Sequence, residues 1–170
     1  DGTFKDFGPS PSINDSGTVA FLAYTQSANT GFRGIYTETS GGTPTKFVDA
    51  SGPYAAFGDP SINGTGTVAF LAFLDNQAVG IYTGPNPTAN KVIQTGDALD
   101  GSTVTGLLGG FDHRGLNDAG QVAFLATLAD GRTVVYRASP TDSDGDGLPD
   151  DWELHGYQVT VNGKTIFVDL

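Results

Sequence analysis

One stretch of this sequence occurs three times, and this repetition limits the possible folds more than any other feature. Each copy has an Asn, a Gly three residues later, and an apolar run Val-Ala-Phe-Leu-Ala. The copies occupy residues 12–23, 61–72 and 115–126. They recur at intervals of about 50 residues, which is typical of one supersecondary unit stacked or arrayed along a chain.

Each copy predicts a hairpin of two strands joined by a tight turn. The Asn side chain can bond the backbone that follows it, and the Gly supplies the left-handed residue of a type I turn with a bulge. The glycines expected to have positive φ are Gly17, Gly66 and Gly120. The apolar run suits a strand covered on both faces. The phenylalanines expected at equivalent buried places are therefore Phe21, Phe70 and Phe124.

Further apolar segments follow each hairpin and predict about four short strands per unit. They lie at residues 34–37, 46–49, 80–83, 91–96 and 133–137. The sequence thus predicts an all-β fold of three four-stranded, antiparallel, blade-like repeats of about 50 residues, with almost no helix before residue 140. A β-trefoil and a β-prism are the alternatives, because both are threefold. The continuous apolar runs favour the propeller-like arrangement.

The segment at residues 1–13 precedes the first copy as residues 100–111 precede the third. We expect it to be the last strand or connection of a preceding unit. Closed propellers typically use 4–8 blades. Three units therefore predict an incomplete ring, an open stack or an assembly between chains.

Two asparagines of the repeated pattern, Asn14 and Asn63, also begin glycosylation acceptor sequences. Both stand where the turn is expected, so we favour the turn role. A tyrosine occurs once per unit, at Tyr36, Tyr82 and Tyr136. We expect these rings to pack in the core or between units, and a sugar-stacking ladder is the alternative.

The charge and composition exclude several classes of partner. Eight basic against nineteen acidic residues give a net charge of −11, which argues against nucleic acid and anionic membrane surfaces. No apolar run approaches the roughly 18 residues of a spanning helix, so membrane insertion is not expected. The chain has no Cys and no Met, and it has 25 Gly. We expect a secreted, extracellular protein whose signal has been removed, or a piece of a longer one.

Residues 142–153 match a twelve-residue calcium loop at every position of its pattern. Calcium takes six to eight hard oxygen ligands, and alternate residues of a tight loop point inward. Gly147 falls at the sharp turn, and Leu148 would contribute its backbone carbonyl. The predicted Ca²⁺ ligands are Asp142, Asp144, Asp146, Leu148, Asp150 and Glu153.

The flanks of this loop differ from an EF-hand, because a strand precedes it and Pro140 excludes a long entering helix. Residues 150–155 can form one short helix, ended by Gly156. Asn162-Gly163 between apolar strands then predicts a C-terminal hairpin. The expected parts are a β-repeat domain at 1–138, the calcium loop and helix at 139–156, and a hairpin arm at 157–170.

Two resemblances add to this prediction. Residues 57–63, residues 96–101 and the Gly-Ile-Tyr segments resemble bacterial secreted proteins built from tandem propeller-like repeats, an uncharacterised family without an assigned activity. The resemblance covers about residues 1–138 and implies a scaffold outside the cell. Residues 142–161 resemble thrombospondin-type-3-like calcium segments and the calcium region of binary-toxin translocation components. The second resemblance implies Ca²⁺, and a second ion that would also involve Asp151.

We expect no enzyme activity, since His113 and His155 lie in a loop and beside a helix end, and no hydrolytic triad is supported. The favoured hypothesis is a non-enzymatic, calcium-stabilised scaffold that assembles with other copies of itself into a fibre or filament through its C-terminal strands. A lectin-like module that binds glycans is the first alternative. A non-catalytic part of a larger secreted hydrolase or toxin-like protein is the second.

Overall fold

The structure is a computed structural model that describes residues 4–25, 33–108, 115–139, 157–161 and 164–168, the last two ranges by their backbone alone. The chain separates into two compact units, Asp1–Ala138 and Ser139–Leu170. Every regular element in the described residues is a β-strand. The all-β prediction is therefore confirmed there. None of these residues forms a helix that could cross a membrane.

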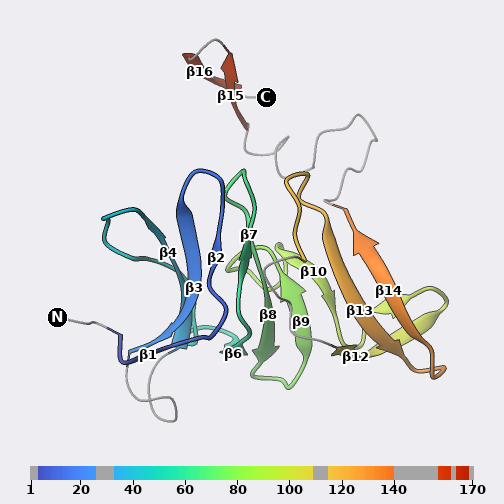
Figure 1. Cartoon of the computed structure of the whole chain (residues 1–170). Coiled ribbons are helices and arrows are strands. Elements are labelled where there is room, and N and C mark those ends of the chain that lie inside the picture. The colour runs from blue at the N-terminus through green and yellow to red at the C-terminus, as the bar shows by residue number, and fades with distance from the viewer. Residues whose placement is uncertain (1–3, 26–32, 109–114, 140–156, 162–163, 169–170) are drawn as a thin grey trace. The chain divides into compact units, whose positions relative to one another are not determined.

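The first unit contains three antiparallel sheets that follow one another in chain order (Figure 1). The first sheet has the order β1-β3-β4-β5, with β2 also beside β3. Its strands are β1 (Asp6–Phe7), β2 (Ser12–Ile13), β3 (Thr18–Tyr24), β4 (Arg33–Thr39) and β5 (Thr45–Asp49). The second has the order β10-β9-β8-β6, with β7 beside β8. Its strands are β6 (Tyr54–Phe57), β7 (Ser61–Ile62), β8 (Val68–Leu74), β9 (Val79–Tyr82) and β10 (Lys91–Gln94).

The third sheet has the order β11-β12-β13-β14. Its strands are β11 (Ala98–Leu99), β12 (Ser102–Leu108), β13 (Val122–Leu128) and β14 (Thr133–Ala138). The repeated sequence pattern forms the same hairpin in each sheet. Ile13 pairs with Val19, Ile62 with Val68, and Leu116 with Val122 in an isolated bridge.

The turn of each hairpin has the predicted backbone. The φ angles of Gly17, Gly66 and Gly120 are 80°, 89° and 72°. In each turn this Gly donates its N–H to the carbonyl of the Asn three residues before it, over 2.9 to 3.0 Å. The prediction of positive φ at these glycines is confirmed.

The prediction for residues 1–13 is wrong where the structure describes them. β1 pairs with β3, so this strand belongs to the first sheet and not to a preceding unit. β6 and β12 likewise pair with the strands that follow them, β8 and β13. The sequence does not predict these strands as members of the following sheet, because β1 has only 2 residues and the ladders of β6 and β12 shift register. The ladder between β6 and β8, for example, shifts register between Tyr54 and Ala56.

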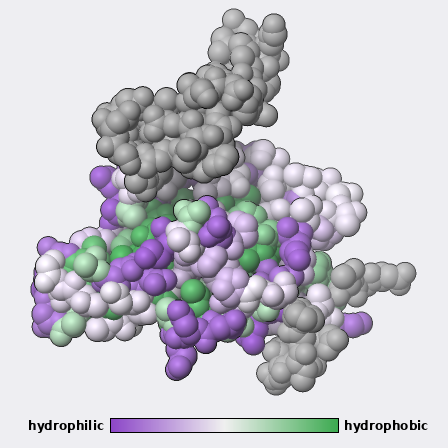
Figure 2. Space-filling model, turned by 180° about the vertical axis from the view of Figure 1, so that it is seen from behind, coloured by the Kyte–Doolittle hydropathy of each residue, from purple (hydrophilic) through white to green (hydrophobic). Residues whose placement is uncertain are grey.

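The second sheet lies between the other two and is buried on both faces. Val68, Phe70 and Ala72 of β8 belong to one apolar core, which the first sheet shares. Ala69 and Leu71 belong to a second core, which the third sheet shares. The expectation of a doubly covered strand therefore holds for β8. Viewed from behind, hydrophobic residues gather in the middle of the described part, with hydrophilic residues at its margins (Figure 2).

The three repeated phenylalanines are not equally buried, which corrects the expectation for two of them. Phe70 is completely buried, whereas Phe21 and Phe124 are partly exposed. Phe21 lies on the outer face of the first sheet, where no further sheet covers it in the described part of the chain. For Phe21, position at the end of the stack, which is not visible in the local sequence, decides the exposure.

In the second unit, β15 (Tyr157–Val161) and β16 (Lys164–Val168) form an antiparallel pair with Tyr157 opposite Val168. This is the hairpin that the sequence predicts.

Candidate functional site

The predicted calcium ligands all lie within residues 142–153, outside the described residues. Their assignment therefore stays a prediction, as does the short helix at 150–155. His113 and His155 also lie outside the described part.

Two acidic turn residues of the first unit have structural partners. Asp97 accepts the backbone N–H of Gln94 over 2.9 Å and pairs with Lys91 over 2.8 Å. Asp100 has a φ of 50° and pairs with Arg132, which lowers the pKa of this carboxyl group. Within residues 4–25, 33–108 and 115–139, no three His, Asp or Glu side chains are grouped as metal ligands would be. These aspartates serve turns and ion pairs.

The outer face of the first sheet carries four aromatic rings that contact one another, which we call the first aromatic quartet: Phe4, Phe7, Phe21 and Tyr36. Phe4 and Phe21 each contact the other three rings, and the ring centroid of Phe4 is 4.6 Å from that of Tyr36 and 5.9 Å from that of Phe21. Phe21 and Tyr36 are paired across the β3–β4 ladder. The sheet thus presents a continuous aromatic surface.

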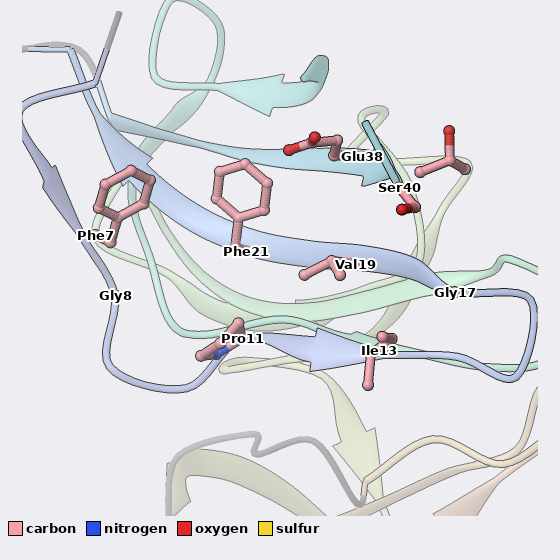
Figure 3. Close-up of a pocket in the computed structure, with 10 residues that line it drawn as sticks. Phe7, Gly8, Pro11, Ile13, Gly17, Val19, Phe21, Glu38 and Ser40 are labelled. Atoms are coloured by element: carbon pink, nitrogen blue, oxygen red, sulfur yellow. The ribbon is translucent and has the colours of Figure 1, made fainter. Parts of the chain in front are cut away.

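A depression of about 510 Å³ runs along this face (Figure 3). Figure 3 shows Phe7 and Phe21 side by side at one end, with Val19 further along β3 and Ile13 on the neighbouring β2. Glu38, Thr39 and Ser40 line its other border. Phe7 is 57% exposed and Ile13 66% exposed, which is unusual for side chains of this size. The depression is therefore an apolar surface with a narrow polar edge.

The second sheet carries the same arrangement, which we call the second aromatic quartet: Tyr54, Phe57, Phe70 and Tyr82. The match extends to the individual ring pairs. Phe70 and Tyr82 are 6.1 Å apart at 34°, and Phe21 and Tyr36 are 6.1 Å apart at 25°. In the third sheet, Phe124 and Tyr136 are 6.0 Å apart at 26°.

The second quartet differs from the first in being covered. Its cover is the inner face of the first sheet, which contributes Ala20, Leu22, Ile35 and Val48 to the shared core; we call these residues the first aliphatic set. Phe57 is 7% exposed and Ile62 is 6% exposed, whereas their counterparts Phe7 and Ile13 are open. The uncovered face thus has the side chains of an inter-sheet contact without the sheet that would complete it.

Burial also shows in the ionisation of the covered rings. It raises the pKa of Tyr82 to about 12, and Asp97 adds to the effect. The pKa of Tyr54 is raised further, again by burial. The Tyr82 hydroxyl donates to Gln94 Oε1 over 3.1 Å and the Tyr54 hydroxyl to the Gly84 carbonyl over 3.3 Å. Both rings have the packing role predicted for Tyr82.

A second contact connects the sheets at their turns, which we call the asparagine ladder. Asn14 Nδ2 donates to the carbonyl of Asn63 over 3.0 Å, and Asn63 Nδ2 donates to the carbonyl of Asn117 over 2.9 Å. At the end of the ladder, Asn117 Nδ2 donates to Gln121 Oε1 of its own turn. Each Asn Oδ1 also accepts a backbone N–H four residues on. The turn role predicted for Asn14 and Asn63 is confirmed, and each amide nitrogen has a partner.

The sequence indicated the repeated hairpins but not the quartets. Phe4 and Phe7 stand in the segment assigned to another unit, and Tyr54 and Phe57 flank two alanines that favour no strand. One signal was available, because an aromatic pair precedes both the first and the second copy. The ladder could not be foreseen, since its bonds join residues of different units.

The fold and this face define an all-β protein whose consecutive sheets pack face to face over two apolar cores. The chain belongs to a family of unknown function (DUF7453), whose model matches residues 1–134. No curated protein and no solved structure matches the chain.

Proposed function

We propose that this chain is a non-enzymatic, extracellular, calcium-stabilised β-repeat scaffold that assembles with other copies of itself. One observation carries the proposal. In each of the two contacts between consecutive sheets, an aliphatic face of one sheet packs on the face of the next that carries its repeated phenylalanine, Phe70 or Phe124, with the same direction along the chain. Such a contact leaves two unlike outer faces and can be extended.

The architecture that we propose is propeller-like, with each sheet as one blade-like unit. Support comes from the face-to-face packing of consecutive sheets over two cores, which suits stacked blades better than a β-trefoil or β-prism. Heterologous contacts of this kind generate rings when the rotation closes and filaments when it does not. The C-terminal strands offer a second route to assembly, because a hairpin edge can pair with another chain.

Residues 142–153 are the segment that we propose binds calcium. The carboxylates of this segment would repel one another without a cation, and Ca²⁺ would hold them in one loop. We propose that the ion orders residues 142–153 within the second compact unit.

The experiment is a measurement of mass and shape against protein concentration. We expect light scattering of the full chain in calcium to give a mass that rises with concentration, with rings or filaments in electron micrographs. A single monomer mass over the whole range, with no assembled particles, would exclude self-assembly.

The aromatic depression favours a second candidate function, the binding of neutral glycans. Sugars stack on aromatic rings, and Glu38, Thr39 and Ser40 could accept or donate hydrogen bonds at the edge. Titration with neutral oligosaccharides should then change the tyrosine fluorescence of the parent but not of Phe7→Ala, because Phe7 lines the depression. No saturable change with any oligosaccharide would remove this candidate.

A further inference from the structure

We infer that the first aromatic quartet is a docking face for the third sheet of a second copy of this chain, joined head to tail. The inference rests on the proposed function and names the surfaces that would carry it. Three features of the sheets support it.

The uncovered first quartet has the same arrangement of rings as the covered second quartet. Phe4, Phe7 and Phe21 repeat the contacts of Tyr54, Phe57 and Phe70, with centroid distances of 5.8 to 5.9 Å in the first quartet and 5.6 to 5.8 Å in the second. The second quartet is covered by an aliphatic sheet face. Because the two quartets are similar surfaces, we expect the first quartet to be covered by an aliphatic sheet face like the one that covers the second.

The chain also offers such a face at its other end. The second sheet covers the third with Ala69, Leu71, Ile81 and Ile93, the counterparts of the first aliphatic set. The outer face of the third sheet has three of these four positions, which we call the third aliphatic set: Ala123, Leu125 and Val135. Val135 is 76% exposed. The two outer faces therefore correspond to the two sides of the internal contact.

The asparagine ladder also supports the inference, because it ends in a carbonyl acceptor at Asn14 and an amide donor at Asn117. The carbonyls of Asn63 and Asn117 each accept two hydrogen bonds, one from the turn Gly and one from the preceding Asn. Among the described contacts, the Asn14 carbonyl accepts only the N–H of Gly17. At the other end, Asn117 Nδ2 is turned to its own Gln121. A head-to-tail junction would let Asn117 donate to Asn14 of the next copy.

Charge would oppose this junction at one point. Inside the chain, the N–H of Gly64 donates to Asp118 Oδ1 over 2.7 Å. At the junction Asp118 stands in the place of Gly64, and Asp15 of the next copy stands in the place of Asp118, so two carboxylates meet. Together with the net charge of −11, this makes the junction weak at low salt and stronger when charges are screened.

The experiment uses two variants of the full chain, each blocking one face at an exposed side chain. Phe7→Asp places a charge on the aromatic quartet, and Val135→Asp places one on the third aliphatic set. Thr88→Asp, in an exposed loop of the second sheet, is the control with the same added charge. Circular dichroism first checks that each variant folds. Masses are then measured by analytical ultracentrifugation at about 1 M salt, where the Debye length is ~3 Å.

We expect the parent and Thr88→Asp to assemble, and each blocked variant alone to remain monomeric. An equimolar mixture of Phe7→Asp and Val135→Asp should form dimers and nothing larger, because each chain keeps one intact face. Asp15→Asn should assemble at lower salt than the parent.

Three outcomes would overturn the inference. Assembly of either blocked variant to the parent's size would show that these faces are not the junction, while leaving self-assembly itself intact. Loss of assembly on deletion of residues 157–170, with both blocked variants unaffected, would assign the junction to the C-terminal strands. A parent that stays monomeric and binds oligosaccharides through Phe7 would remove both this junction and self-assembly.

Discussion

Glycine at the hairpin turns has a backbone angle that few other residues adopt. Gly66 has a φ of 89°, and open space surrounds the position where a Cβ would stand. Any penalty for a side chain there comes from the backbone and not from crowding.

Gly66→Val should therefore destabilise the protein by more than about 1 kcal/mol, because a β-branched residue is strained in the left-handed region. Urea unfolding measures the change in the free energy of unfolding. Gly52→Val is the matched control, since Gly52 also has open space around it but a φ outside that region. Equal curves for the two variants would contradict the strain argument.

The covered tyrosines predict a loss of stability at alkaline pH. The unfolded chain ionises Tyr at about 10, whereas the pKa of folded Tyr82 is about 12 and that of Tyr54 is also raised. The folded state thus keeps protons that the unfolded state releases. Its stability is fully present below pH 10 and is lost as the pH rises through 12.

The measurement is the free energy of unfolding in urea at several pH values from 9 to about 12. Replacing both residues, as in Tyr54→Phe with Tyr82→Phe, should flatten the decrease. The same slope in parent and double variant would show that other groups cause it.

At the scale of elements, the asparagine ladder can be tested by a substitution that removes a single hydrogen-bond donor. Asn63 is 4% exposed, and its Oδ1 accepts from both the Thr65 hydroxyl and the Thr67 N–H over 2.8 Å. Asp keeps these acceptors and changes only the donor.

Asn63→Asp should cost roughly 1–3 kcal/mol, because a carboxylate oxygen would face the Asn117 carbonyl without a hydrogen between them. Asn117→Asp is the control, since the Gln121 amide can rotate and donate to the new carboxylate. Thermal unfolding compares the two. Equal shifts in melting temperature would show that the bond between the sheets contributes nothing beyond the turn.

The calcium segment is tested by isothermal calorimetry. Asp146→Ala should lose calcium uptake relative to the parent, because Asp146 supplies one of the predicted carboxylate ligands. Asp75→Ala removes an equal charge from an exposed turn of the second sheet and should bind as the parent does. Removing calcium should loosen residues 140–157 and leave the sheets folded. Unchanged uptake by Asp146→Ala would refute the assignment.

The sequence predicts those elements that a pattern within a few neighbouring residues specifies. The hairpins at Asn14, Asn63 and Asn117 were predictable, because Asn, Gly and an apolar run specify a turn and its second strand within a few residues. The strand β6 was not, because Tyr54 and Phe57 acquire their burial only from the first sheet. The aromatic face was missed for the same reason, since Phe21 and Phe70 have nearly identical neighbours in sequence and opposite surroundings in space.

At the scale of the whole molecule, the two compact units make different contributions. The sheets of Asp1–Ala138 have their own two cores, so they should fold without the C-terminal hairpin. Deleting residues 157–170 should leave the melting temperature of these sheets unchanged. Because copies are proposed to join through the outer faces of the first and third sheets, the deletion should also leave assembly intact. Calorimetry and sedimentation check the two points. A large drop in the melting temperature would show that the hairpin completes the first unit.

The recurrence of one contact between sheets also bears on how such a gene can change. The second sheet presents an aliphatic face on one side and an aromatic face on the other, and the three described sheets together leave the first aromatic quartet and the third aliphatic set uncovered by another described sheet. Duplication of the DNA for the second sheet would therefore again pack an aliphatic face on an aromatic one. Related chains can then differ in their number of sheets. The length of the stack changes by one sheet at a time, while the two outer faces keep the ability to pair.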